Sequence, residues 1–283
     1  MAPTGGGAET GGEGATGTKG GDTSTGGTTG PGDPDPSEGC GTADPSDCLP
    51  RTWNGLDYYV DVPDSSDPNH PCPVVFQYHP LGGTASQART LYRVRPIFAD
   101  AIYVSPQGSD NGFPNTGGVD EQMTRDIMAD IEARLCIDRA RYFATGFSYG
   151  GSMSYTAACN TCDKFRAVAA MAGAPISGAH CTSPTPERPV AVLGIHGEAD
   201  TALPITMAEP IIQTWIEKNG CAEETQPSDL LDSICATVES SLSTGAYQGC
   251  MEGYPVIGCP MPGRPHEIPS WSPDAMASFF MQF

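Results

Sequence analysis

The sequence lacks any apolar run that approaches the ~20 residues of a membrane-spanning helix. It also does not open on a charged segment followed by an apolar one, as an export signal would. We therefore expect no transmembrane segment, and we expect any export signal to precede this sequence in the natural precursor.

Basic residues are scarce, with 14 Lys and Arg against 34 Asp and Glu and a formal net charge of -20. A surface this acidic repels nucleic acid and anionic lipid, and it slows the approach of anionic substrates without affecting neutral ones. We therefore predict no nucleic-acid partner. The charge keeps the chain soluble but does not identify a partner.

Large apolar side chains are almost absent from residues 1–47, which consist mainly of Gly, Thr, Pro and acidic residues. Such a segment cannot bury enough surface to offset the entropy lost on ordering. We predict a disordered tether over residues 1–47, pinned at most by a disulfide near Cys40 or Cys48. Residues 48–283 have the length of one α/β domain.

Cysteine is abundant, with eleven residues, and a reduced cytosolic protein rarely has so many without a metal or redox role. The close pair Cys159 and Cys162 follows a predicted helix instead of beginning one, which argues against a thiol oxidoreductase. We predict structural disulfides and a secreted or cell-surface tethered protein. A Gly/Thr-rich tether is typical of a bacterial lipoprotein, although this sequence contains no residue for a lipid anchor.

The apolar patterns alternate between strands and helices. Strands are predicted at residues 57–63, 73–79, 101–106, 141–145, 166–173 and 189–197, with a short one at 254–258. Helices are predicted at residues 119–137, from 149 to about 159, at 207–220 and at 272–283. This order predicts an α/β fold with a mostly parallel sheet and helices on both faces.

The stretch "RYFATGFSYGGSMSYTAAC" passes from a strand pattern through a serine into a helix pattern. Gly146, Ser148 and Gly150 form the G-x-S-x-G arrangement, in which small flanking residues let the backbone turn sharply beneath an exposed hydroxyl. This context makes Ser148 a candidate nucleophile.

A serine hydroxyl becomes a good nucleophile only when a histidine takes its proton and a carboxylate orients that histidine. Asp200 follows a buried strand in "IHGEAD", and Glu198 is the alternative acid. Of the five histidines, His266 alone lies in a loop beyond these acids. The chain order Ser, acid, His is that of the α/β-hydrolase triad.

The oxyanion that forms on attack needs two backbone N–H donors. The residue after the nucleophile, Tyr149, supplies one. The other comes from the loop "YHPLGGTAS", where Pro80 has no N–H and Leu81 is the first residue beyond His79 that can donate.

These residues resemble the secreted α/β-hydrolase esterases that include feruloyl esterases and polyhydroxybutyrate depolymerase-like proteins. The resemblance covers about residues 58–283 and rests on "YHPLGG", "SPQG", "CIDRARYFATGFSYGGSMSYTAAC", "IHGEAD" and a late histidine flanked by Gly and Pro. It implies the α/β-hydrolase fold, the triad Ser148, Asp200 and His266, and the oxyanion donors Leu81 and Tyr149. The chain departs from the family at Pro80, where the family has glycine, and at "RPHEIP".

Further substrate contacts are predicted at His79, Gln107 and Trp271. By chain position, however, His79 and His196 each end a strand, where histidines usually orient a turn by hydrogen bonding.

The implied activity is acyl transfer from a carboxylic ester, with no cofactor and no metal. Feruloyl or related aromatic esters of plant cell walls are the first predicted substrates, and polyesters of the polyhydroxybutyrate or polyethylene terephthalate type are alternatives. A protein of another class, which uses the same fold only to bind at a surface, also fits the tether and the cysteines. We expect a monomer.

Cys136 and Cys159 end the predicted helices on either side of the nucleophile strand, so a disulfide could join them, and the resemblance suggests the same pair. Four later cysteines, Cys221, Cys235, Cys250 and Cys259, lie between the acid and His266. We expect disulfides among these four to restrain the segment that leads to His266, without a fixed pairing.

Overall fold

In the computed structural model, the described residues are 33–42, 50–161, 163–175, 188–226, 235 and 245–283, together with Met1. Ten strands in this part of the chain form one sheet in the order β1-β2-β4-β3-β5-β6-β7-β10-β9-β8. They are β1 (Arg51–Trp53), β2 (Leu56–Asp61), β3 (Cys72–Tyr78), β4 (Ile102–Pro106), β5 (Ile137–Phe147), β6 (Phe165–Met171), β7 (Ala191–Gly197), β8 (Thr225–Gln226), β9 (Gly245–Tyr247) and β10 (Val256–Met261).

The six central strands, from β4 to β10, are parallel, whereas the strands at both edges pair antiparallel. Strands β3 and β7 are buried along their whole length, because helices cover both sheet faces. The loops that follow the carboxyl ends of these parallel strands meet at one edge, where open α/β sheets hold their chemistry.

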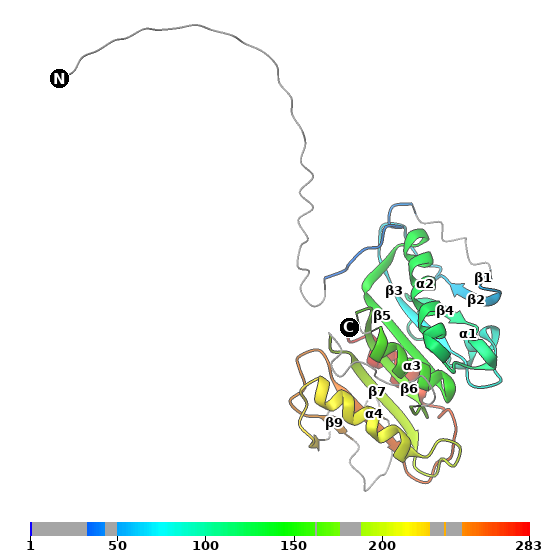
Figure 1. Cartoon of the computed structure of the whole chain (residues 1–283), viewed down its shortest axis with the longest axis vertical. Helices are drawn as coiled ribbons and strands as arrows, with labels where there is room; N and C mark the ends of the chain where they lie inside the picture. Colours follow the sequence, from blue (N-terminus) through cyan, green and yellow to red (C-terminus); the bar gives the residue numbers. More distant parts are fainter. Residues whose placement is uncertain (2–32, 43–49, 162, 176–187, 227–234, 236–244) are drawn as a thin grey trace.

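Helices α2 (Val119–Arg134), α3 (Tyr149–Asn160) and α4 (Ile205–Lys218) pack on one face of the sheet. Helices α1 (Ala85–Leu91) and α6 (Ser272–Phe280) pack on the other. Figure 1 shows α3 and α4 in front of the sheet and the red α6 behind it. Among the described residues, no helix is long and apolar enough to cross a lipid bilayer.

This architecture confirms the predicted α/β class with a mostly parallel sheet. Strand β5 is longer than predicted, because it begins at Ile137 where the helix was expected to end. Helix α1 had no sequence prediction; Thr84 caps it by accepting the N–H of Gln87, whose side chain accepts the N–H of Thr84 in return.

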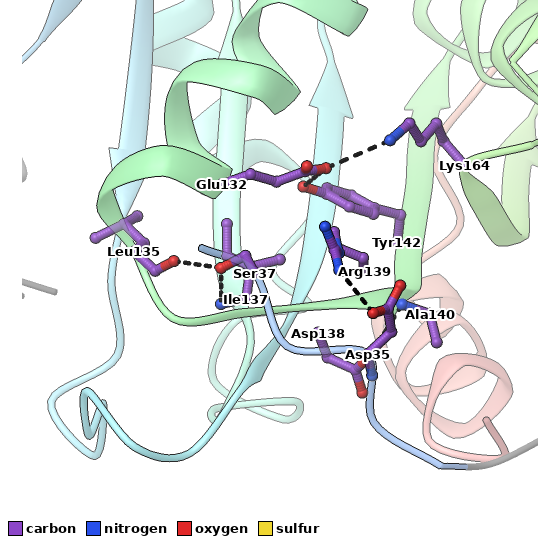
Figure 2. Close-up of polar contacts among 10 residues, drawn as sticks. All are labelled: Asp35, Ser37, Glu132, Leu135, Ile137, Asp138, Arg139, Ala140, Tyr142 and Lys164. Atoms are coloured by element: carbon purple, nitrogen blue, oxygen red, sulfur yellow. Dashed lines mark hydrogen bonds and ion pairs between the residues drawn. The ribbon is translucent and has the colours of Figure 1, made fainter. Parts of the chain in front are cut away.

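Residues 33–42 of the predicted tether pack on the domain, around Cys40, where the sequence analysis allowed a disulfide to pin the chain. The Ser37 hydroxyl donates to Leu135 O at 2.7 Å and accepts the Ile137 N–H at 3.0 Å, as Figure 2 shows. Asp35 pairs with Arg139 at 2.8 Å. The remaining residues of the predicted tether, 2–32 and 43–47, lie outside the described part.

A disulfide between Cys40 and Cys136 fixes this segment to the start of β5. The predicted disulfide between Cys136 and Cys159 is therefore wrong, although Cys159 is disulfide-bonded. The sequence pattern could not reveal this pairing, because residues 33–42 have no apolar periodicity that predicts their packing.

The four late cysteines pair as Cys221 with Cys250 and Cys235 with Cys259, which confirms the expected disulfides in this region. The second pair joins residue 235 directly to β10, the strand that leads to His266. Cys48, Cys162 and Cys181 lie outside the described residues, and Cys72 is a buried free thiol.

Candidate active site

Ser148 lies on a sharp turn between β5, which ends at Phe147, and α3, which begins at Tyr149. Its backbone has φ 57° and ψ -118°, a left-handed conformation that L-residues rarely adopt. The Ser148 N–H donates to Met171 O on β6 at 3.0 Å, and Ser148 O accepts the Ser152 N–H. These bonds hold a strained residue in place, a feature that concentrates at functional sites.

The glycines on either side of Ser148 are required by close backbone contacts. A Cβ atom on Gly146 would lie 2.2 Å from the carbonyl carbon of Gly150. A Cβ atom on Gly150 would lie 1.9 Å from Tyr78 O at the end of β3. The G-x-S-x-G pattern therefore has a local cause here: only glycine lets the turn fold back over the neighbouring strand.

His266 lies in the loop between β10 and α6, and its Nδ1 is 2.6 Å from Asp200 Oδ2. The His266 ring also packs on Phe147, with ring centroids 4.6 Å apart. Phe147 directly precedes Ser148, so the structure brings the three residues of the predicted triad to one edge of the sheet. No hydrogen bond between Glu198 and His266 occurs in the described structure.

The histidine loop and the acid loop are fastened to each other by backbone contacts. The Ala199 N–H donates to Arg264 O at 2.9 Å, and the Glu198 N–H donates to Met261 O at 3.0 Å. Gly197 permits this approach, because a Cβ atom there would lie 2.4 Å from Arg264 O. The position of His266 relative to Asp200 is therefore set by the backbone and not by one side-chain bond.

Asp200 is 4% exposed, and its Oδ1 accepts the N–H groups of Ala202 and Leu203, each at 2.8 Å. Burial acts to raise the pKa of Asp200, but the hydrogen bonds from His266 and from these two N–H groups outweigh it and hold the pKa below its usual value. The carboxylate is therefore ionised near neutral pH and accepts the His266 Nδ1–H.

His196 is a second imidazole beside Asp200, and the sequence did not predict this contact. Its Nε2 lies 2.7 Å from Leu203 O and 3.3 Å from Asp200 Oδ2. Burial lowers the pKa of His196, which favours the neutral ring that donates from Nε2. The interpretation that His196 orients a turn agrees with its bond to Leu203.

The side chains of the two residues predicted as oxyanion donors meet at this edge. A Cβ atom on Gly112 would lie 2.8 Å from Tyr149 Cδ1 and 3.3 Å from Leu81 Cδ1, so both side chains converge over that glycine. In the same loop the Gly82 and Gly83 N–H groups donate to Asn111 O and Pro80 O. Neither the Leu81 nor the Tyr149 N–H has a partner among the described residues.

His79 and Gln107 were predicted to contact substrate, but the structure gives them internal partners. His79 is fully buried; its Nδ1 lies 2.8 Å from Pro80 O, and its Nε2 accepts the Gly108 N–H at 3.0 Å. Gln107 reaches His79 Nε2 at 3.0 Å and accepts the Ala85 N–H at 2.9 Å. Both side chains therefore shape the loop that carries Leu81.

Trp271, the third predicted substrate contact, precedes α6 and packs against the core cluster beneath that helix. It is partly exposed.

Asp120 also organises this edge, and the sequence analysis did not predict a role for it. Asp120 is 1% exposed and accepts the N–H groups of Ser109 and Asn115 at 3.1 and 2.8 Å. It thereby fixes the loop that contains Gly112, against which Leu81 and Tyr149 pack. Burial raises the pKa of this carboxyl.

Residues 81–243 match the phospholipase/carboxylesterase family model. A feruloyl esterase C from Emericella nidulans is 34% identical over 257 residues, which cover 87% of this chain and 91% of that protein. A probable feruloyl esterase C from Aspergillus terreus is 33% identical over 258 residues, covering 86% and 90%.

The fold also resembles a solved acetyl xylan esterase from Aspergillus awamori, with a TM-score of 0.60 and 16% sequence identity. The match covers 82% of this chain and 98% of the other. At this identity the likeness bears on the fold alone.

Proposed function

Because the chain belongs to the phospholipase/carboxylesterase family and is a serine carboxylesterase, we propose that Ser148, His266 and Asp200 are its nucleophile, base and orienting acid. The observation that carries this proposal is the 2.6 Å contact between His266 Nδ1 and Asp200 Oδ2, next to the Phe147 ring. It supports a His266 tautomer with the proton on Nδ1, so that Nε2 is free to act as the base.

In the proposed mechanism, the Ser148 Oγ–carbon bond forms as the hydroxyl proton moves to His266 Nε2. The ester C–O bond then breaks, and the same proton passes to the departing alcohol. A water molecule attacks the acyl-enzyme, gives its proton to His266, and the acid leaves as Ser148 regains its hydrogen. Asp200 stabilises the protonated His266 in both steps without taking its proton.

The N–H groups of Leu81 and Tyr149 are proposed to stabilise the oxyanion in both steps. Neither group has a partner among the described residues, which supports this role, because a free donor aimed at developing charge needs no rearrangement during the reaction. The buried contacts of His79 with Pro80 and Gly108 support a fixed position for the Leu81 loop.

Feruloyl or related aromatic esters are the substrates that we propose. The support is the similarity to feruloyl esterases along most of the chain. The net charge of -20 is also suitable, because a neutral ester approaches an acidic protein freely whereas the released carboxylate is repelled.

The test is a comparison of methyl ferulate, a short hydroxybutyrate oligomer and an aromatic polyester film, with a Ser148→Ala variant as the blank. We expect the highest kcat/KM on methyl ferulate. A tenfold higher value on the oligomer, or faster release of soluble product from the film, would replace the feruloyl proposal by one of the polyester alternatives.

We also propose an extracellular location. The support is the disulfides Cys40–Cys136, Cys221–Cys250 and Cys235–Cys259, which persist in oxidising compartments. Detection of the active enzyme in the culture medium of the native cell would test the location. A lipid tether at the N-terminal side and a monomeric state stay predictions.

A further inference from the structure

A cavity of about 570 Å³ lies between α4 and the sheet. Aliphatic side chains of α4, among them Ile212 and Ile216, form one wall, and strands β7 and β10 form the floor. The lining includes neither Ser148 nor His266. Its size is within the range of small-molecule sites.

Two neighbouring glycines create the floor of this cavity. Gly194 on β7 and Gly258 on β10 are register partners in the parallel pair. A Cβ atom on Gly194 would lie 2.8 Å from the Tyr155 hydroxyl oxygen and 2.9 Å from Ile212 Cδ1, whereas a Cβ atom on Gly258 would have no atom within 4 Å. Strand interiors rarely contain glycine unless something must approach the backbone closely.

Two buried polar side chains line the cavity with one polar atom each left unpaired. Tyr155, on α3, is 2% exposed, and its hydroxyl has no hydrogen-bond partner among the described residues. His196 is 6% exposed and donates from Nε2 to Leu203 O, while its Nδ1 has no partner among the same residues. Side chains this deeply buried usually find a partner for each polar atom, so these two unpaired atoms are available to a ligand in the cavity.

The two atoms are complementary, because the Tyr155 hydroxyl is a donor and the Nδ1 of a neutral His196 is an acceptor. Gly194, which lies beneath the Tyr155 hydroxyl, and His196 share one face of β7, about 6.6 Å apart along the strand. Both unpaired atoms therefore belong to side chains over the same face of β7, where a ligand hydroxyl that accepts from Tyr155 and donates to His196 would satisfy both.

We propose that this cavity is a second binding site, which takes a neutral small molecule with a hydroxyl group on an apolar body, such as a phenol or an aromatic alcohol. The Ile212 and Ile216 side chains would cover the apolar body, and the hydroxyl would bridge Tyr155 and His196. Glu198 and Glu209 also line the cavity, and none of its described lining residues is Lys or Arg, so carboxylate ligands are excluded. The site is independent of the proposed substrate.

Calorimetry with three matched compounds tests the ligand class. We expect benzyl alcohol to bind, toluene to bind about fivefold more weakly because it lacks the hydroxyl, and benzoate not to bind. Protein whose active serine has been blocked by a phosphonate should bind benzyl alcohol equally well. Loss of binding on blocking, or benzoate binding as tight as that of the alcohol, would overturn the proposal.

Two variants test the location. Gly258→Val fills the open floor with a residue suited to a strand, and it should weaken benzyl alcohol binding at least tenfold. Tyr155→Phe should weaken the binding of benzyl alcohol about fivefold and leave the binding of toluene unchanged. Tyr103→Phe, which alters a buried tyrosine bonded to Phe98 O outside the cavity, is the control and should change neither.

If Gly258→Val does not fold, as circular dichroism would reveal, Tyr155→Phe alone decides. Unchanged alcohol affinity in a folded Tyr155→Phe variant would refute the site, as would the absence of any benzyl alcohol binding to the wild-type protein.

Discussion

At the scale of single residues, Asp200 and Glu198 lie two positions apart, but we expect their substitutions to have contrasting effects on activity. Asp200→Asn should lower kcat on methyl ferulate by about 10³- to 10⁴-fold, because the amide favours the wrong histidine tautomer. Glu198→Gln is the matched control and should stay within about threefold of the wild type, since Glu198 makes no contact with His266 in the described structure. Steady-state kinetics decide, and the reverse ranking would transfer the acid role to Glu198.

The buried His79 should make the stability of the protein depend on pH. Burial lowers the pKa of His79 in the folded protein, whereas its pKa in the unfolded chain is ~6.5. As the pH falls below that value, the unfolded chain binds a proton that the folded one does not, so the free energy of unfolding decreases. His79→Asn should reduce this loss of stability between about pH 7 and pH 5. Part of the loss should stay, because burial also lowers the pKa of His196.

Urea unfolding of both proteins at the two pH values measures the effect. His70→Asn serves as the control, because the His70 side chain is 82% exposed. An equal pH-dependent loss in His79→Asn and in the wild type would show that His79 does not stay neutral when folded.

The residues of the proposed triad could be predicted from the sequence because each follows a strand in a fixed chain order. Ser148, Asp200 and His266 needed only local patterns. The role of Asp120 and the contact of His196 with Asp200 could not be predicted, since each depends on a loop whose path in space has no periodic signature.

At the scale of elements, we expect a glycine-to-alanine substitution at the turn from β5 into α3 to have the opposite effect from the one that helix propensity predicts. In an open helix position, replacing glycine by alanine stabilises by about 1 kcal/mol. Gly150→Ala should instead destabilise by ~1–3 kcal/mol, because its Cβ atom meets Tyr78 O of β3. It should also lower activity strongly, since Tyr149 would shift with the turn.

Gly258→Ala is the matched control, because its added Cβ atom meets nothing within 4 Å. Thermal unfolding and methyl ferulate hydrolysis of the two variants test the account. A Gly150→Ala protein as stable and active as Gly258→Ala would contradict the close approach of the turn to β3.

The central strands and the helices α2, α3, α4 and α6 could be predicted from the apolar periodicity of the sequence. Strands β1, β8 and β9 were not predicted, because they are only two or three residues long and are held by pairing with their neighbours. The partners of the late cysteines likewise depend on this pairing and not on their spacing.

At the scale of the whole molecule, residues 33–42 are predicted to stabilise the domain. Removing residues 1–42, with Cys136→Ser to avoid a free thiol, should lower the free energy of unfolding by roughly 4 kcal/mol, as expected for a disulfide that closes a long loop. Removing only residues 1–32 keeps every contact described for the segment and should cost little. Equal stability of the two shortened proteins would show that the segment contributes nothing.

Activity at low temperature should survive both truncations. The segment joins the start of β5 at Ile137, whereas Ser148 follows the other end of that strand. The sequence analysis allowed a disulfide near Cys40, but it could not reveal the packing around it, because composition describes an average and the further contacts depend on Asp35 and Ser37.

Covalent labelling tests the central claim, that Ser148 is the nucleophile and His266 its base, most directly. A serine-directed phosphonate should attach one group per chain, and peptide mass mapping should locate it on Ser148. Labelling should be absent in Ser148→Ala and slowed at least about 10³-fold in His266→Ala, with circular dichroism confirming that both variants fold. A label on another residue, or a His266→Ala variant labelled at the wild-type rate, would contradict the account.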